Sequence, residues 1–392
     1  MDIYLDWLNL GLRWLHIIVG VAWIGASFYF NWLLNRLTQP EEPDPQVQGE
    51  LWAIHAGGFF RVQKRNMAPG SLPEPLHWFK WEAYWTWLSG FALLVLMYYV
   101  QADRYLIDPS VADLEHWQAV AIGLATLFIG TGVYDASWRS PLAYRAPGLL
   151  SVIGCVLLGL LAFGLTQVFS GRGAYMHIGA LLGTIMVANV AHVIMPSQRE
   201  LVRATLAGED PDPKFAVSAG LRSLHNNYLT LPVLFIMISA HYPMTYGHSA
   251  NWLVLIGLFV CSVFIRHFFN VRWALGDART MWWLAMGIGG FIGVAVLTNP
   301  PVQNDGQQVA FSEVEIIIND RCVACHAVKP TMMPVPGKGV VLDSPDAIVE
   351  QAAAIQSQAV LSRAMPLGNV TGMTDAEREL LGAWVRSGAG RN

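Results

Sequence analysis

Long apolar stretches alternate with short polar loops over the first three quarters of the chain. A helix needs about 20 mostly apolar residues to cross the hydrocarbon layer of a membrane. Eight segments meet or approach that length, of which the sixth and seventh fit least well: residues 8–34, 82–100, 117–135, 147–169, 175–195, 226–241, 252–270 and 281–297. The pattern predicts an all-α polytopic membrane bundle of about eight spans.

Composition supports this interpretation. Hydrophobic residues make up 54% of the chain and charged residues 13%, whereas about a quarter of an average soluble chain is charged. The net charge of -4 is small, and no Lys/Arg block of the kind that follows a phosphate backbone is present. Membrane lipid is therefore the expected environment, and nucleic acid is not an expected partner. The first apolar run lacks a basic leader and a small-residue cleavage site, so we expect it to be retained.

The last part of the chain has a different character. Asn299, Pro300 and Pro301 are expected to end the eighth span, and the composition turns polar from about residue 302. The remaining stretch has the length of one small domain. We therefore expect a membrane domain over residues 1–300 and a soluble domain over residues 301–392.

The distribution of basic residues predicts the orientation. Thirteen Lys and Arg residues fall in loops on one side of the expected bundle, and three fall on the other side. Loops rich in Lys and Arg face the cytoplasm. An even number of spans then places both termini and the C-terminal domain on the periplasmic side of a bacterial inner membrane.

One motif in the C-terminal domain points to electron transfer. Cys322, Cys325 and His326 form the Cys-x-x-Cys-His signature, in which two thiols bind haem covalently and the adjacent His binds the iron. The alternative interpretation is an unmodified Cys pair. Covalent haem c is attached outside the bacterial cytoplasm, which agrees with the predicted orientation.

A second axial ligand is expected well downstream of His326. Met365 lies on a Met-Pro loop and is the expected ligand; Met373 is an alternative, and the third possibility is that neither Met binds. Thr374 and Glu377 have the spacing of a capping box for a closing helix. This order of haem motif, Met-Pro loop and closing helix resembles a class I cytochrome c.

Polar residues inside a bilayer are costly and are candidates for function. His16 lies in the first span, in a stretch that resembles the opening helix of membrane haem-binding proteins such as the bacterial membrane protoporphyrinogen oxidase. His177 and His192 lie fifteen residues apart on the fifth span, which places them on a broad common face. We expect haem b between His16 and His177, with His192 as a weaker second site. The alternative is that these His residues only hydrogen-bond between helices.

The predicted cytoplasmic end gathers side chains suited to a small polar anion. They come from loops and helix ends that the sequence brings to one side: His225, Asn226, Asn227, Asp135, Arg139 and Glu82. Loop charges are often only a solvated surface, but Asn pairs and His at helix ends in lipid need partners. The exposed amides at the start of a helix add partial positive charge. We therefore expect the catalytic site at this end.

Four sequence runs then give a resemblance that extends over nearly the whole chain. They are residues 77–82 (HWFKWE), 132–135 (GVYD), 183–190 (GTIMVANV) and 223–232 (SLHNNYLTLP), followed by the haem motif. Together they resemble the membrane-bound, cytochrome c-linked urate oxidase (urate hydroxylase) family of bacterial purine catabolism. The resemblance implies oxidation of urate to 5-hydroxyisourate. Electrons would leave through haem c to a terminal oxidase or a soluble cytochrome c, without formation of hydrogen peroxide.

Two other classes of function remain open from the sequence. The chain could be a non-catalytic membrane cytochrome subunit that relays electrons from another dehydrogenase. It could also be a haem-gated transporter, in which solute moves without net oxidation. Urate-dependent reduction of the purified protein distinguishes both from an oxidase.

Overall fold

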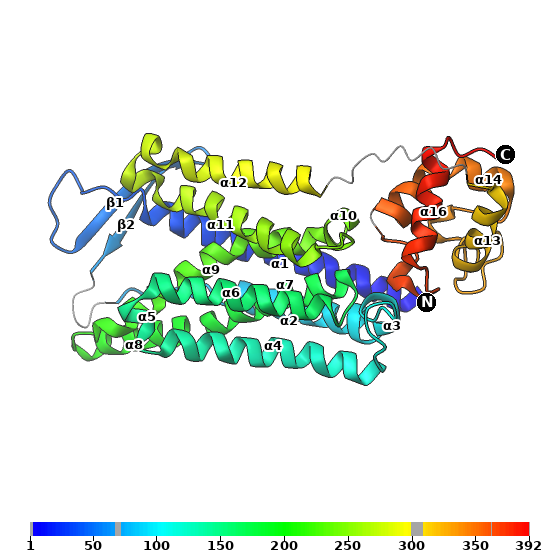
Figure 1. The fold of residues 1–392 in the computed structure, drawn as a ribbon. Helices are drawn as coiled ribbons and strands as arrows, with labels where there is room; N and C mark the ends of the chain where they lie inside the picture. Colours follow the sequence, from blue (N-terminus) through cyan, green and yellow to red (C-terminus); the bar gives the residue numbers. More distant parts are fainter. Residues whose placement is uncertain (1–2, 67–71, 299–308, 362, 392) are drawn as a thin grey trace.

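The computed structural model describes residues 3–66, 72–298, 309–361 and 363–391. The chain is mostly helical, and its helices form two groups (Figure 1). Long helices run side by side in an extended bundle, and a smaller group of short helices lies at one end of it. The expected end of the last span at Asn299 and the expected domain boundary lie outside the described residues.

Among the described residues, the bundle contains nine long helices joined by short ones. The long helices are α1 (Ile3–Leu34), α2 (Trp81–Leu94), α4 (His116–Arg139), α6 (Pro147–Thr166), α7 (Gly171–Asn189), α8 (Met195–Ala207), α9 (Pro213–Ser239), α11 (Asn251–Leu275) and α12 (Asp277–Leu297). The short helices α3 (Ala102–Tyr105), α5 (Leu142–Arg145) and α10 (Pro243–Tyr246) lie in the connections. Every one of the eight segments expected from the sequence is helical.

Six helices in the described residues are long and apolar enough to cross a membrane, which is consistent with a membrane protein. They are Ile3–Leu34, His116–Arg139, Pro147–Thr166, Gly171–Ala207, Asn251–Leu275 and Asp277–Leu297. The other two expected spans, α2 and α9, fall outside this set. Helix α9 is less apolar than these six helices because four polar residues lie within it: Arg222, His225, Asn226 and Asn227.

Helix α7 forms the centre of the bundle. Its residues are buried on nearly every side, and Tyr175 and Ile178 are each 1% exposed. A π-helical turn, Val190–Ile194, joins it to α8 in one continuous helical segment, so this segment extends well past residue 195. By contrast, α1 and α12 are almost unburied. Their exposed apolar side chains suit contact with lipid acyl chains.

A β-hairpin in the loop after α1 departs from the expected all-helical fold. Strands β1 (Val47–His55) and β2 (Gly58–Arg65) pair antiparallel, with Trp52 opposite Arg61. The two residues between them, Ala56 and Gly57, both have positive φ. Two-residue turns of this kind match the twist of paired strands, so local turn geometry explains the hairpin.

The C-terminal group has its own hydrophobic core. It comprises α13 (Phe311–Arg321), α14 (Pro345–Glu350), α15 (Ala352–Ile355), the π-helical segment Gln356–Leu361 and α16 (Asp375–Arg386). Ile318, Leu381 and Trp384 are fully buried in this core. The capping box of Thr374 and Glu377 is confirmed at the start of α16.

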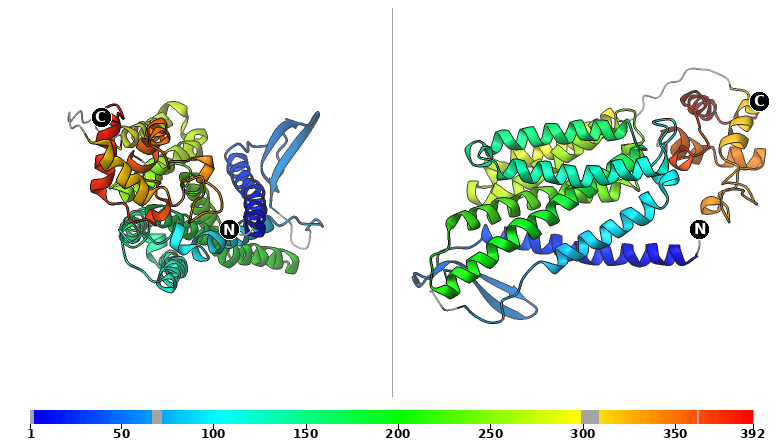
Figure 2. Two further views of the ribbon diagram at one scale, coloured as in Figure 1. Left: turned by 90° about the vertical axis from the view of Figure 1, so that its right-hand side faces the viewer. Right: turned by 90° about the horizontal axis from the view of Figure 1, so that it is seen from below.

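The arrangement of the two groups defines two ends of the molecule. The start of α1 and the C-terminal group lie at one end, and the hairpin with α5 and α8 lies at the other (Figures 1 and 2). Contacts between α3 and the 3₁₀ turn Leu367–Asn369 join the C-terminal group to the bundle. We call these the C-terminal-group end and the hairpin end.

Candidate functional site

The Cys-x-x-Cys-His motif follows directly after α13. The backbone amides of Cys325 and His326 both donate to the carbonyl of Cys322, at 3.1 and 2.9 Å, which folds the motif into one turn. Both thiols are free. Burial raises the pKa of Cys322 to about 12 and also raises the pKa of Cys325.

The ring of His326 is oriented by backbone contacts. Its Nδ1 lies 3.2 Å from the carbonyl oxygen of Val340. A Cβ atom at Gly337 would lie 3.0 Å from the ring, so the ring packs closely on this glycine. A His whose Nδ1 is held by a carbonyl has its Nε2 available for a metal. Two free thiols and one oriented imidazole fit a covalent haem.

The two candidate Met ligands occupy different environments. Met373 is 2% exposed and belongs to the core of the C-terminal group. Met365 is half-buried at the edge of that core, and Nη1 of Arg378 donates to its carbonyl at 2.7 Å. Met332 and Met333 are more exposed, at 42% and 37%. Arg378 therefore holds the loop that carries Met365, and the Met365 side chain is only partly buried.

A polar network near the hairpin end joins α4, α7 and α9. Arg222 is 3% exposed and donates from Nη2 to Asp135 Oδ1 at 2.9 Å and from Nη1 to Asn189 Oδ1 at 3.1 Å. Asn189 Nδ2 donates to Asn226 Oδ1 at 2.9 Å. Arg139 also pairs with Asp135, at 2.6 Å. We call these five residues the Arg222 network, and the charge of Arg222 is compensated within it.

His225 joins the same network through a tyrosine. The Tyr134 hydroxyl lies 2.7 Å from His225 Nδ1 and accepts a hydrogen bond from Asn189 at 3.0 Å. The Trp138 ring lies 4.1 Å from the His225 ring, centroid to centroid. The structure thus brings together four of the residues expected at the catalytic site, namely Asp135, Arg139, His225 and Asn226.

Asn227 belongs to a different cluster on the other side of α9. Its Oδ1 accepts a hydrogen bond from Arg266 Nε at 2.9 Å. The guanidinium of Arg266 lies 4.1 Å from the ring centroid of Phe28 in α1. Asn270 follows Arg266 by four residues on α11 and therefore shares its face. We call Asn227, Arg266, Asn270 and Phe28 the Arg266 cluster.

Arg266 and Asn270 close the seventh expected span at the same end as the expected site, but they were not among the residues predicted to be catalytic. The signal was available, because an ionisable residue in a span is by default a functional candidate. Glu82, which was expected at the site, lies half-buried in the first turn of α2. In the described residues its side chain makes no hydrogen bond or ion pair with either group.

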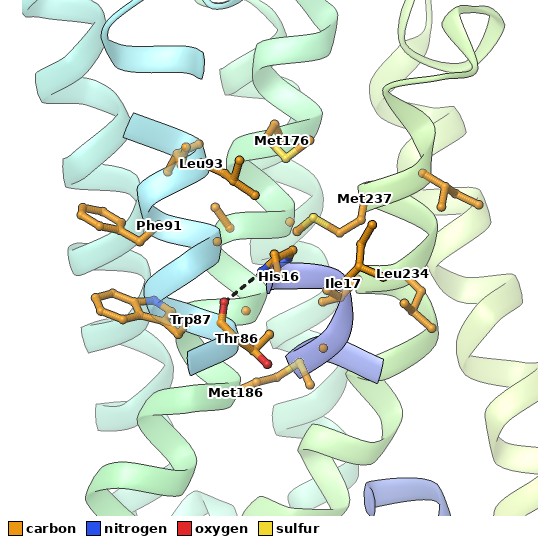
Figure 3. Close-up of a pocket in the computed structure, with 18 of the residues that line it drawn as sticks. His16, Ile17, Thr86, Trp87, Phe91, Leu93, Met176, Met186, Leu234 and Met237 are labelled. Carbon is orange, nitrogen blue, oxygen red and sulfur yellow. Dashed lines mark hydrogen bonds between the residues drawn. The ribbon is translucent and has the colours of Figure 1, made fainter. Parts of the chain in front are cut away.

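A cavity of about 630 Å³ lies between α1, α2, α7 and α9 (Figure 3). Most of its lining is apolar, and it extends along α1 from Arg13 to Phe28. That interval of fifteen residues corresponds to about 22 Å of helix. Figure 3 shows His16 in the middle of the cavity, with Trp87 and Phe91 of α2 on one side and Leu234 and Met237 of α9 on the other.

His16 is fixed by helix α2. Its Nδ1 lies 3.0 Å from the Thr86 carbonyl oxygen and 3.1 Å from Ser89 Oγ. A Cβ at Gly90 would lie 2.9 Å from the ring, so this glycine allows the close approach. Within the described chain its Nε2 makes no hydrogen bond. The residue therefore presents one uncommitted ring nitrogen in a cavity large enough for a flat cofactor.

The expected pairing of His16 with His177 across one haem does not agree with the structure. His177 is fully buried against Gly123 and Tyr99, and it does not line the cavity. His192 lies in the π-helical turn, exposed and away from the cavity. Helix α7 turns Gly179 and Gly183 toward the cavity instead. His241, just after α9, does line it, and no sequence pattern singled it out.

A second cavity, of about 490 Å³, lies between the bundle and the C-terminal group. Arg104, Asp108 and Arg172 line it from the bundle, and Arg363 and Arg378 line it from the other side. Arg172 also lines the first cavity, and its Nε donates to the Tyr98 hydroxyl at 3.1 Å. Arg172 therefore stands where the two cavities adjoin.

Comparison with known proteins gives the family. The family model described as Urate oxidase N-terminal matches residues 2–299. This match covers the helical bundle and the hairpin and stops before the C-terminal group. No curated protein and no solved structure matches the chain. Because the matched region is most of the sequence, the chain belongs to the Urate oxidase N-terminal family.

Proposed function

We propose that the protein is a membrane-bound oxidoreductase that oxidises urate to 5-hydroxyisourate and passes the electrons through a covalent haem c to the respiratory chain. The observation that carries the proposal is the combination of two parts in one chain. The bundle matches a urate oxidase family model, and the C-terminal group carries two free thiols and the oriented His326. Oxygen need not be the direct electron acceptor in this arrangement, so hydrogen peroxide need not form.

The proposal includes a specific membrane topology. We propose that α2 and α9 cross the membrane beside the six longer and more apolar helices, which gives eight spans. Both run along the bundle with the other helices. The hairpin end, which carries most of the loop Lys and Arg residues, would face the cytoplasm of a bacterium. The C-terminal group would then form a periplasmic cytochrome c domain.

The chemistry requires the removal of two electrons. Urate and one water molecule give 5-hydroxyisourate, two protons and two electrons. Haem c, which Cys322, Cys325, His326 and Met365 would hold, would accept one electron at a time, and a thioether ligand would favour its reduced state. The polypeptide must bind the substrate, orient it, and take up the protons. His225, which joins the Arg222 network through the Tyr134 hydroxyl, carries an imidazole that can take up a proton.

The cavity around His16 suits a second flat cofactor, and we propose haem b there. His16 provides an uncommitted ring nitrogen, and Gly183, beside which a Cβ would meet open space, leaves room for a flat group. Arg13 and Arg172 line the end toward the C-terminal group and suit the carboxylates of such a cofactor. His241, rather than His177, is the candidate partner of His16 on geometric grounds. His192 lines neither of the two cavities described above, so we do not propose a second haem b there.

The test is direct reduction by substrate. Purified, oxidised, haem-containing protein is mixed with urate without oxygen, and haem c absorbance is followed. We expect reduction that depends on urate concentration, together with formation of 5-hydroxyisourate. Protein that shows haem bands and is reduced by dithionite but not by urate would instead be a relay subunit for another dehydrogenase.

A further inference from the structure

Two buried arginines of the bundle differ in one important respect. Arg222 is 3% exposed and pairs with the Asp135 carboxylate at 2.9 Å. Arg266 is 7% exposed, yet no carboxylate of the described residues lies within 4.0 Å of its nitrogen atoms. Its hydrogen bond from Nε to Asn227 and its contact with the Phe28 ring leave the positive charge uncompensated. A buried charge without a partner destabilises a fold, most of all in lipid.

The amides beside Arg266 also have unused hydrogen-bonding capacity. Asn227 is 2% exposed, and its Nδ2 has no partner in the described structure. Asn270 is 8% exposed, and neither its Nδ2 nor its Oδ1 has a partner there. Asn270 lies near the Tyr228 hydroxyl, but that hydroxyl bonds to His267 Nδ1 at 2.6 Å instead. Buried polar atoms are nearly always satisfied, so a ligand or water must complete this site.

The cluster borders the large cavity. The ring of Phe28 makes a cation-π contact with the Arg266 guanidinium, and Phe28 lines the cavity at its end toward the hairpin. Thr230 lines it as well, and its hydroxyl donates to the Asn227 carbonyl at 2.6 Å. A ligand bound at the Arg266 cluster would therefore lie next to the space in which we propose a cofactor.

We propose that Arg266, Asn227 and Asn270 bind the anionic ring of the substrate. The inference rests on the proposed function and assigns its substrate site to the Arg266 cluster rather than to the Arg222 network. In the Arg222 network the buried arginine pairs with the Asp135 carboxylate and donates to Asn189, which suits a role in holding α4, α7 and α9 together. Among the described residues the Arg266 cluster has no carboxylate, and three of its amide atoms, Asn227 Nδ2 and both Asn270 Nδ2 and Oδ1, have no hydrogen-bond partner.

The chemistry of the cluster matches a planar purine anion. Urate carries one negative charge near neutral pH, and its edges alternate between carbonyl oxygens and N–H groups. A guanidinium binds an anionic edge with two parallel hydrogen bonds. A carboxamide offers one acceptor and two donors, which match a carbonyl next to an N–H. We therefore expect anionic purines to bind here more tightly than neutral ones.

The experiment compares Arg266→Met and Asn270→Leu with the wild-type, full-length, haem-containing protein. Arg199→Gln, an exposed arginine of α8, is the matched control. Half-saturating urate is measured from haem reduction, and the rise in Tm caused by urate is measured independently. We expect half-saturating urate to rise about ten- to a hundred-fold in both site variants, which corresponds to loss of one charge-assisted contact. The urate-induced rise in Tm should shrink in parallel, and Arg199→Gln should match the wild type.

Stability without substrate separates binding from a structural role. Arg266→Met removes an uncompensated charge, so its Tm in the absence of urate should equal or exceed that of the wild type. Arg222→Met should lower Tm because it leaves Asp135 without its buried partner. If Arg266→Met does not fold, Asn270→Leu, which is nearly isosteric, decides the question by its urate response alone.

The outcomes distinguish this inference from the function on which it rests. Wild-type protein that urate does not reduce would overturn the proposed function and the substrate site together. Wild-type activity with unchanged half-saturating urate in both Arg266→Met and Asn270→Leu would overturn the site alone. That second result would mean that ordered water completes the cluster.

Discussion

Arg222 of α9, which is buried, and Asp135 of α4, which is partly exposed, form an ion pair with 2.9 Å between Nη2 and Oδ1. The two residues are 87 positions apart in the sequence, so the pair ties together helices that no local interaction connects. Asn189 of α7 extends the contact to a third helix through its bond to Arg222. The central helices near the hairpin end are therefore held by polar contacts rather than by apolar packing alone.

The first prediction concerns this pair. Asp135→Asn keeps the shape of the side chain but removes the charge opposite Arg222, which should lower the free energy of unfolding by about 1.5–3 kcal/mol. Thermal unfolding in detergent measures the change. Glu200→Gln removes a surface pair with Arg203 and should change stability by less than about 1 kcal/mol. Equal effects of the two variants would contradict a structural role for the Arg222 network.

Met365 is tested by spectroscopy of the bound haem. Met365→Ala should abolish the weak far-red sulfur-to-iron absorption band of a His/Met haem and lower the reduction potential. Met332→Ala, at an exposed position near the haem motif, should preserve both. Retention of the band in Met365→Ala, with its loss in Met373→Ala, would identify the buried Met373 as the ligand instead.

The proposed haem b should be present as a second haem that is not covalently bound and can be extracted. Acid acetone should remove non-covalent haem from the purified protein and leave covalent haem c behind. His16→Ala should lose the extractable fraction because it removes the ring nitrogen in the cavity. His177→Ala should retain that fraction, since His177 faces Gly123 and Tyr99 rather than the cavity. Only covalent haem in the wild type would rule out this cofactor.

The contact between the two helical groups is tested at Gly368. This glycine has φ +59, and a Cβ there would collide with the Arg104 carbonyl. Gly368→Ala should therefore push the C-terminal group away from the bundle and slow reduction of haem c by substrate. Gly372, with φ +67, has open space beside it apart from the Arg321 side chain. Gly372→Ala introduces similar backbone strain without the collision, so it serves as the control. Equal rates in the two variants would show that this contact does not limit electron transfer.

Topology is tested with reporter fusions. A fusion at Asp210, in the loop between α8 and α9, should be active only with a cytoplasmic reporter. Fusions at Ser387, at the end of α16, should be active only with a periplasmic one. A periplasmic signal at Asp210 would reverse the orientation, and with it the side from which substrate enters.

The sequence by itself determined the features that depend on local patterns. Each of the eight apolar runs corresponds to a helix, although α9 begins at Pro213 rather than near Asn226, and α8 was not expected as a helix of its own. The spacing of Thr374 and Glu377 gave the start of α16. The hairpin in the loop after α1 was missed, because its turn at Ala56 and Gly57 carries a weak sequence signal.

Only the tertiary structure decided which polar side chains meet. His225, Asn226 and Asn227 are consecutive and were expected to act as one group. Successive residues of an α-helix point about 100° apart, so Asn226 contacts Asn189 of α7 while Asn227 contacts Arg266 of α11. The same geometry turns His177 away from the cavity that contains His16. Helical positions follow from residues close in sequence, but partners depend on how helices distant in the chain pack together.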